Sequence, residues 1–148
     1  DPFVFSLSLS TYLLYTIFVE MITTDGQTLA TVMPHIMKFN IEGGGSSVAK
    51  YSKIAQAFGV HDPNRSVKEN AYRSVDAIVR LSIDVGTAKS IVQMGGSRKD
   101  LPKLTEQALL DVSGIFNDRH AQRSDIAKIY EAAMENEEMY PTRVKSKM

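Results

Sequence analysis

After residue 26, large apolar side chains recur every three to four residues through most of the chain, and this spacing limits the fold more than any other feature. It places the apolar side chains on one face of a helix, whereas a half-buried strand requires strict alternation. Glycine and proline interrupt the pattern where one helix must end and the next begin. Nothing in this body of the chain resembles a βαβ nucleotide-binding fold. The sequence therefore predicts an all-α helical bundle of five or six helices.

The positions of the helices follow from these apolar stripes. The first stripe runs from Leu29 to Met37, and Pro34 is expected to kink its helix because proline lacks an N–H. A flexible loop, IEGGGSS, is predicted over 41–47, where the triple glycine follows a helix and carries no phosphate-binding pattern. The later helices are predicted over 48–58, from 66 to about 85, from 101 onward and from 124 onward.

Local signals mark several helix ends. Ser66 and Glu69 form an S-x-x-E capping box, in which each side chain accepts a hydrogen bond from the other residue's backbone N–H. Gly86 is expected to stop the helix that this box begins. Ser124 is expected to cap the last helix, and Phe58 to face inward at the end of the second.

The apolar segment 1–22 differs from the rest of the chain. It has no charge between Asp1 and Glu20, but serine and threonine dilute its apolar character. A membrane-spanning helix needs about 20 apolar residues, with a lower limit of roughly 17. The stretch FVFSLSLS also alternates as a strand does. Three alternatives stay open: a segment buried in the core or covered by a partner, a membrane helix, or the remainder of a targeting sequence.

Charge and cysteine content narrow the classes of function. Lys+Arg and Asp+Glu both count 17, so no strong overall field attracts nucleic acid, and no nucleic-acid partner is expected. The chain has no cysteine, which excludes disulfides, thiolate metal sites and a cysteine nucleophile. Residues 135–148 carry both signs of charge and few large apolar groups, and are expected to form a charged tail that is frayed or bound to a partner.

Several motifs occur in one order along the chain. ATVMPHIMKFN (30–40) is similar to A-x-x-L-P-H-V-M-x-F-N, and AKYSKIAQAFGV (49–60) to K-Y-x-x-I-A-x-A-L-G-V. Asp100-Leu101-Pro102 matches D-L-P, and Asn117-Asp118-Arg119 stands where the pattern has N-P-R. Together these motifs resemble the C-terminal helical domain of the iron-containing (group III) alcohol dehydrogenases. The resemblance implies a dehydrogenase-like helical domain over 23–134, between the apolar segment 1–22 and the tail 135–148.

The resemblance also implies where a divalent metal would be held. The family binds its metal with one Asp and three His, and the histidine of its P-H-G motif falls on Asp25, with Gly26 keeping its place. The two histidines of its preceding G-x-x-H-x-x-x-H-x-x-G pattern fall on Thr11 and Tyr15, of which the second position is not a ligand. Iron or zinc needs three or four converging N/O ligands. Asp25 is therefore a degenerate ligand position, and we expect no metal, cofactor or catalytic residue.

The histidines that the chain does contain offer no replacement site. His35, His61 and His120 fit no local metal motif, and a structural or solvent-exposed role is favoured for each. The chain contains neither a G-x-S-x-G nor an H-E-x-x-H motif, so two common hydrolase constellations are also missing from this sequence.

Two functions follow from this reading. The first is a non-catalytic structural or accessory subunit of a larger assembly, in contact with other protein subunits and with a membrane through residues 3–22. An organellar, mitochondrial complex would fit that description. The alternative is a C-terminal fragment of an NAD(P)-dependent, metal-containing alcohol dehydrogenase whose cofactor domain lies on another chain.

Overall fold

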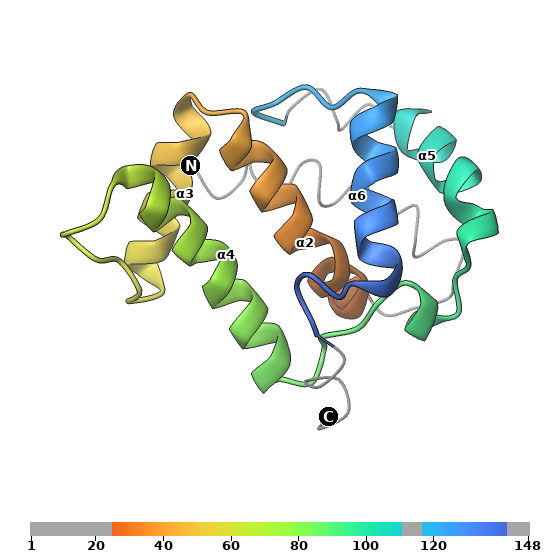
Figure 1. Ribbon diagram of the computed structural model, residues 1–148, viewed down its shortest axis with the longest axis horizontal. Coiled ribbons are helices and arrows are strands. Elements are labelled where there is room, and N and C mark those ends of the chain that lie inside the picture. The colour runs from red at the N-terminus through yellow and green to blue at the C-terminus, as the bar shows by residue number, and fades with distance from the viewer. Residues whose placement is uncertain (1–24, 111–116, 142–148) are drawn as a thin grey trace.

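The computed structural model describes residues 25–110 and 117–141, and every regular element assigned within these ranges is helical (Figure 1). The all-α prediction is therefore confirmed for the described residues. The predictions for the apolar segment 1–22 and for residues 142–148 lie outside them. In chain order the elements are α2 (Asp25–Glu42), α3 (Ser46–Ala57), α4 (Val67–Asp84), η1 (Val92–Met94), η2 (Arg98–Asp100), α5 (Leu101–Leu110) and α6 (Arg123–Glu135).

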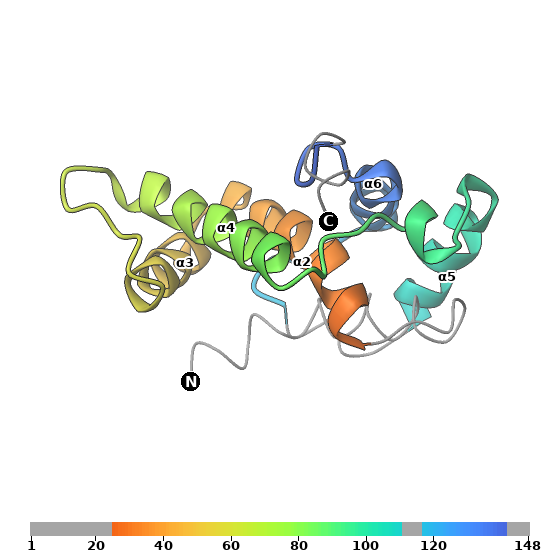
Figure 2. The ribbon, with the colours of Figure 1, turned by 90° about the horizontal axis from the view of Figure 1, so that it is seen from below.

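Helix α2 is the central element of the bundle. It runs between α3 and α4 on one side and α5 and α6 on the other (Figures 1 and 2). Its apolar residues are therefore buried on two faces, and this explains why the stripe from Leu29 to Met37 is so dense. Within the described ranges, no helix combines the length and the apolar character that crossing a bilayer requires.

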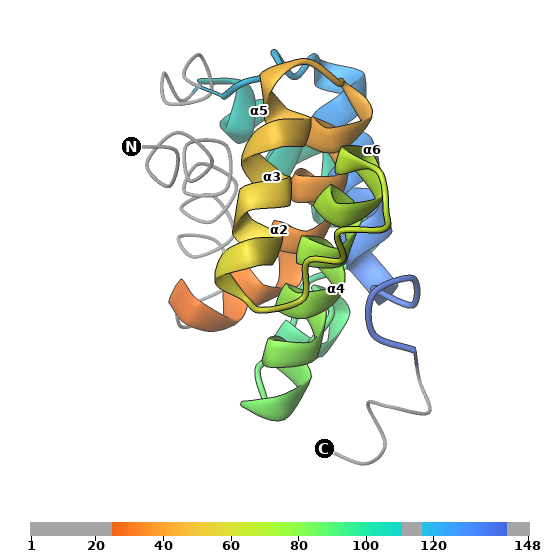
Figure 3. The ribbon, with the colours of Figure 1, turned by 90° about the vertical axis from the view of Figure 1, so that its left-hand side faces the viewer.

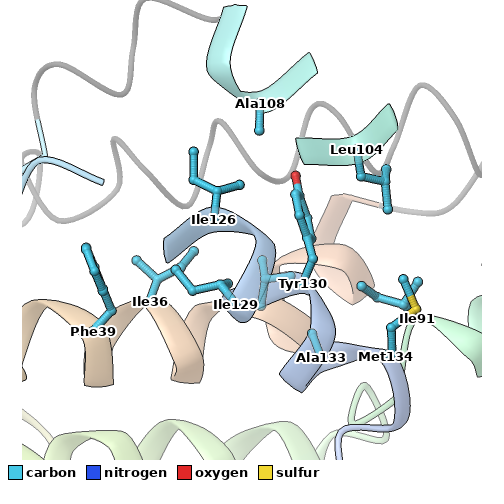
Figure 4. Close-up of a cluster of buried hydrophobic side chains, with 11 residues drawn as sticks. Ile36, Phe39, Ile91, Leu104, Ala108, Ile126, Ile129, Tyr130, Ala133 and Met134 are labelled. Atoms are coloured by element: carbon cyan, nitrogen blue, oxygen red, sulfur yellow. The ribbon is translucent and has the colours of Figure 1, made fainter. Parts of the chain in front are cut away.

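A first core lies between α2, α5 and α6. Figure 4 shows the side chains of α6 between those of α5 and those of α2. Tyr130 and Met134 of α6 and Ile36 of α2 are completely buried there. The buried members are Val32, Ile36, Phe39, Ile91, Leu104, Ala108, Ile126, Ile129, Tyr130, Ala133 and Met134.

A second core lies on the other side of α2, where α3 and α4 pack side by side in front of it (Figure 3). Tyr51 of α3 and Val75 of α4 are buried, as their stripes predict. The buried members are Met37, Ile41, Tyr51, Ala71, Val75, Ala88, Met139 and Tyr140.

The last two members of this second core correct the prediction of a loose tail. Met139 is 8% exposed and Tyr140 is fully buried, although both lie in the segment 135–148. Asn136 is also buried, and the backbone N–H of Tyr140 donates to its carbonyl at 2.8 Å. The tail prediction is therefore wrong for residues 136–141. Two buried apolar side chains and one turn are enough to pack residues 136–141 against α2.

The predicted boundaries are right at one helix start and wrong at another. At α4 the capping box is confirmed, because the Glu69 N–H donates to Ser66 Oγ at 3.2 Å and the Ser66 N–H to Glu69 Oε2 at 2.9 Å. Ser124 does not cap α6. Gln122 holds that position, and its N–H donates to the Asp125 carboxylate at 2.9 Å. A carboxylate in the first turn also complements the helix dipole, which favours this start.

The predicted loop over 41–47 is shorter than expected. Ile41 belongs to α2 and is completely buried in the second core, so the helix continues to Glu42. Helix α3 already begins at Ser46. Gly44 and Gly45 make the turn with φ of 75° and 63°, a conformation that costs side-chain-bearing residues energy.

Phe58 does not face inward. Helix α3 ends at Ala57, and Phe58 is its C-terminal capping residue with 39% of its surface exposed. The chain turns away at this point, so the last residue of the predicted stripe lies at the rim of the bundle rather than beneath α4.

Candidate functional site

Asp25 is the first residue of α2, at the position that the resemblance gives to a metal ligand. Its backbone is helical, and Gly26 beside it is exposed. His35 lies ten residues further along the same helix. At 1.5 Å per residue this separation is about 15 Å along the axis. Asp25 and His35 are therefore too far apart to hold one metal ion.

The turn of α2 that precedes Pro34 is completed from outside the helix. Proline provides no N–H for the carbonyl four residues earlier, which is that of Ala30. The hydroxyl of Tyr140 donates to this carbonyl at 2.7 Å. The neighbouring carbonyl of Thr31 accepts a hydrogen bond from Asn136 Nδ2 at 3.2 Å. Helix α2 runs without interruption from Asp25 to Glu42 across Pro34, and the Tyr140 hydroxyl provides the donor that the proline lacks.

His35 has a structural role in the same place. Its side chain is 5% exposed, and Nε2 lies 2.7 Å from Asn136 Oδ1. The Asn136 amide also donates to the Lys89 carbonyl at 2.8 Å, so one side chain joins α2, the segment after α4 and the end of α6. A ring nitrogen engaged in this way is not available to a metal.

Burial lowers the pKa of His35, while the hydrogen bond with Asn136 and the charge of Glu138 act in the opposite direction and Lys38 adds to the lowering. The Lys38 ammonium itself forms an ion pair with Glu138. The fold therefore favours the neutral imidazole. Below the unfolded-state pKa of about 6.5, the unfolded chain binds more protons than the folded chain does.

From this difference in pKa we expect the free energy of unfolding to fall as the pH is lowered from 7 to 5. His35→Gln should show a smaller decline, because glutamine carries no charge at either pH. Urea denaturation across this range measures the slope. His120→Gln, at an exposed histidine, is the matched control for the loss of one histidine from the chain. An equal decline in His35→Gln and in the wild type would contradict the assignment.

The Asn117-Asp118-Arg119 motif joins three parts of the bundle. The Asn117 and Asn40 amides exchange hydrogen bonds at 2.8 and 3.1 Å. Arg119 stacks 3.8 Å from the centre of the Phe39 ring and donates to the Phe39 carbonyl at 2.7 Å, near the C-terminal end of α2. Asp118 accepts a hydrogen bond from Lys50 of α3 at 2.6 Å. Through these contacts the motif holds α2 and α3 together. The contribution includes Asp118, which stands in place of the pattern's proline.

The donor set at the degenerate ligand position does not fit the metal that the resemblance implies. Asp25 contributes one carboxylate, and the other matching ligand position holds the hydroxyl of Thr11, which lies outside the described residues. Iron and zinc sites are built from imidazole, thiolate and carboxylate ligands. Among the described side chains, those of residues 26–110 and 117–141, no three His, Asp or Glu groups converge as a metal site would require.

Asn136 and Tyr140 are the polar residues that sequence reasoning missed. Asn136 adopts the left-handed conformation, with φ of 56°, directly after α6. An asparagine just beyond a helical stripe is a known signal for such a C-terminal cap. No local signal marks Tyr140, because its partner carbonyl is 110 residues away in the sequence.

The sequence matches the model of the Fe-containing alcohol dehydrogenase family, C-terminal, over residues 5–134. Lactaldehyde reductase of Escherichia coli (strain K12) is 33% identical over 111 residues, which cover 75% of this chain and 28% of that relative. 1,3-propanediol dehydrogenase of Klebsiella pneumoniae is 29% identical over 108 residues, or 73% of this chain and 27% of that relative. The chain thus spans less than a third of the length of these curated relatives.

Solved structures show the same fold. A crystal structure of 1,3-propanediol oxidoreductase superposes with a TM-score of 0.79 at 25% identity, over 85% of this chain and 32% of that one. An alcohol dehydrogenase from Oenococcus oeni gives a TM-score of 0.78 at 24% identity, over 84% of this chain and 32% of that one. The helical arrangement around α2 therefore recurs in alcohol dehydrogenases.

Proposed function

The chain belongs to the Fe-containing alcohol dehydrogenase family and corresponds to its C-terminal helical part, and from this premise we propose that it acts as a non-catalytic structural subunit. The observation that carries the proposal is the donor set, in which Asp25 replaces the histidine of the P-H-G motif. The carboxylate of Asp25 and the hydroxyl of Thr11, at the two ligand positions that this chain matches, do not provide the three or four converging N/O ligands that an iron or zinc site needs. Such a subunit would contact other protein subunits in a larger assembly.

The packing of the domain supports the same proposal. Buried apolar side chains form both cores, and the Tyr140 hydroxyl donates to the Ala30 carbonyl for which Pro34 has no N–H. His35 is engaged with Asn136, and the Asn117-Asp118-Arg119 motif joins helices. These residues, which carry the family resemblance in this part of the chain, thus maintain the fold, whereas the resemblance places a metal-ligand histidine where this chain has Asp25.

Metal content is the direct test. The full chain, expressed with iron and zinc in the medium, is expected to hold far less than one metal ion per molecule by inductively coupled plasma mass spectrometry. Asp25→Ala is expected to leave that content unchanged. Asp76→Ala, which removes an exposed carboxylate on α4, is the matched control. One metal ion per chain that is lost in Asp25→Ala alone would make Asp25 a working ligand and overturn the proposal.

A second candidate function has its own support, because the relatives named above are enzymes. In this alternative the chain is the C-terminal part of an NAD(P)-dependent, metal-containing alcohol dehydrogenase and works with a separate nucleotide-binding chain. Affinity purification of the tagged chain from cells that produce it distinguishes the two. A stoichiometric nucleotide-binding partner with NAD-dependent oxidation of an alcohol would favour the alternative, and its absence would favour the structural subunit.

A further inference from the structure

A groove opens on the surface where the end of α3 meets α4. Its volume is about 400 Å³, and it lies on the face of α4 opposite to the second core. Phe58 and Val60 form one wall, and the other wall is a single face of α4. The α4 residues that line it are Arg73, Asp76, Ala77, Arg80, Leu81 and Asp84.

The charges along this face alternate in sign. From the N-terminal end the order is Arg73, Asp76, Arg80 and Asp84, with spacings of three or four residues that keep all four on one side of the helix. The Arg80 and Asp84 side chains are 77% and 57% exposed and pair within the helix at 3.2 Å. An exposed pair of this kind contributes little to the stability of a helix. Arg73 has a contact within the chain as well, because its Nε donates to the Val60 carbonyl at 2.5 Å. The exposed pair and this hydrogen bond involve three of the four residues, but neither explains why the signs alternate along the whole face.

When the helix is reversed, this order of charges becomes complementary to itself, with a negative charge opposite each positive one. In two antiparallel copies of α4 whose two-fold axis passes near residue 78, position 73 faces position 84 and position 76 faces position 80. Each arginine then meets an aspartate of the other copy, and all four pairs are opposite in sign. An interface between identical chains related by a two-fold axis requires this kind of self-complementarity, which a different partner does not.

Apolar groups lie among these charges. Leu81 is 46% exposed and Phe58 is 39% exposed, and both line the groove. Ala77 lies close to the centre of the charge order, where a small side chain allows two helices to approach each other. Covering these side chains removes apolar surface from water, which is the main favourable term in protein association.

We propose that this groove is the contact surface of a homodimer in which the α4 helices of two copies lie antiparallel, with Leu81 of each copy in the groove of the other. The four Arg–Asp pairs fix the direction and register, and the apolar side chains supply the attraction. The proposal does not depend on whether the domain is catalytic, so its test is separate from that of the metal content.

Sedimentation velocity of the full chain over a concentration series tests the dimer. The wild type is expected to dimerise, with a dissociation constant that rises with salt because exposed charge pairs are screened. Leu81→Asp places a charge in the groove, and Asp76→Arg places an arginine opposite Arg80 of the other copy. Each variant should raise the dissociation constant roughly a hundredfold. The combined variant Asp76→Arg/Arg80→Asp restores opposite signs and should regain most of the affinity.

Val67→Asp is the matched control, because Val67 is an exposed apolar residue of α4 (55% exposed) outside the groove. Its dissociation constant should equal that of the wild type, and circular dichroism should show that all variants are folded. A wild type that stays monomeric at every concentration would overturn the proposal. So would a dimer that resists both Leu81→Asp and Asp76→Arg, or a combined variant no tighter than Asp76→Arg alone.

Discussion

Replacing Tyr140 with alanine is expected to lower the free energy of unfolding by about 4 kcal/mol, a large part of the total stability of a domain of this size. The side chain is completely buried in the second core, so its removal leaves a cavity beside Met37 and Ile41. Its hydroxyl also donates to the Ala30 carbonyl, for which Pro34 provides no N–H. Urea denaturation followed by circular dichroism measures the loss.

Two further variants separate the hydrogen bond from the packing. Tyr140→Phe keeps the ring and should cost about 1–3 kcal/mol, the penalty for a buried carbonyl without a partner. In a Pro34→Ala background the helix supplies its own N–H to the Ala30 carbonyl, so the further cost of Tyr140→Phe should become smaller. If Tyr140→Phe costs the same in both backgrounds, the hydroxyl does not compensate for the proline.

Replacing Asn136 with alanine is expected to cost about 3 kcal/mol, from two sources. The first is the loss of hydrogen bonds to His35 and to the carbonyls of Thr31 and Lys89, which leaves buried polar groups without their partner. The second is the left-handed backbone at this position, with φ of 56°, which asparagine tolerates better than alanine. The change in the midpoint of urea denaturation reports the sum.

The variants Asn136→Gly and Asn136→Asp separate the contribution of the hydrogen bonds from that of the backbone conformation. Glycine removes the hydrogen bonds but adopts the left-handed conformation freely, so it should be about 1 kcal/mol more stable than alanine at this position. Aspartate keeps an acceptor for His35 but has no donor for the two carbonyls, so it should recover only part of the loss. Alanine and glycine variants of equal stability would show that backbone strain contributes nothing here.

Much of the helical architecture could be predicted, because the information lies within each helix. Ile126, Ile129, Tyr130 and Ala133 recur at helical spacing and are all buried in the first core. Ser66 and Glu69 encode their capping box within one turn. The predicted start of α6 was wrong because serine and aspartate are both favoured as N-terminal capping residues, whereas Gln122 carries no strong signal. In the structure, the hydrogen bond from the Gln122 N–H to the Asp125 carboxylate sets the start at Gln122.

The polar contacts around α2 could not be predicted in the same way. Met139 and Tyr140 are two apolar residues in a charged stretch, too few to produce a periodic pattern. Their partners lie on a helix about a hundred residues earlier, and sequence patterns report only neighbours along the chain. The prediction that Asp25 occupies a changed ligand position rests on the family motif alone, since a single aspartate at a helix start is otherwise an ordinary residue.

The hydrogen bond between Tyr140 and Ala30 has a consequence for synthesis. Its two residues are 110 positions apart, so α2 emerges from the ribosome long before the group that completes its proline-containing turn. Until that residue follows, the Ala30 carbonyl can accept hydrogen bonds only from water, and the apolar face of the earliest described helix is without cover. Chains dominated by such distant contacts fold slowly, because the ends of a long loop must meet before the contact stabilises them. Chaperone binding during translation would protect α2 in this interval.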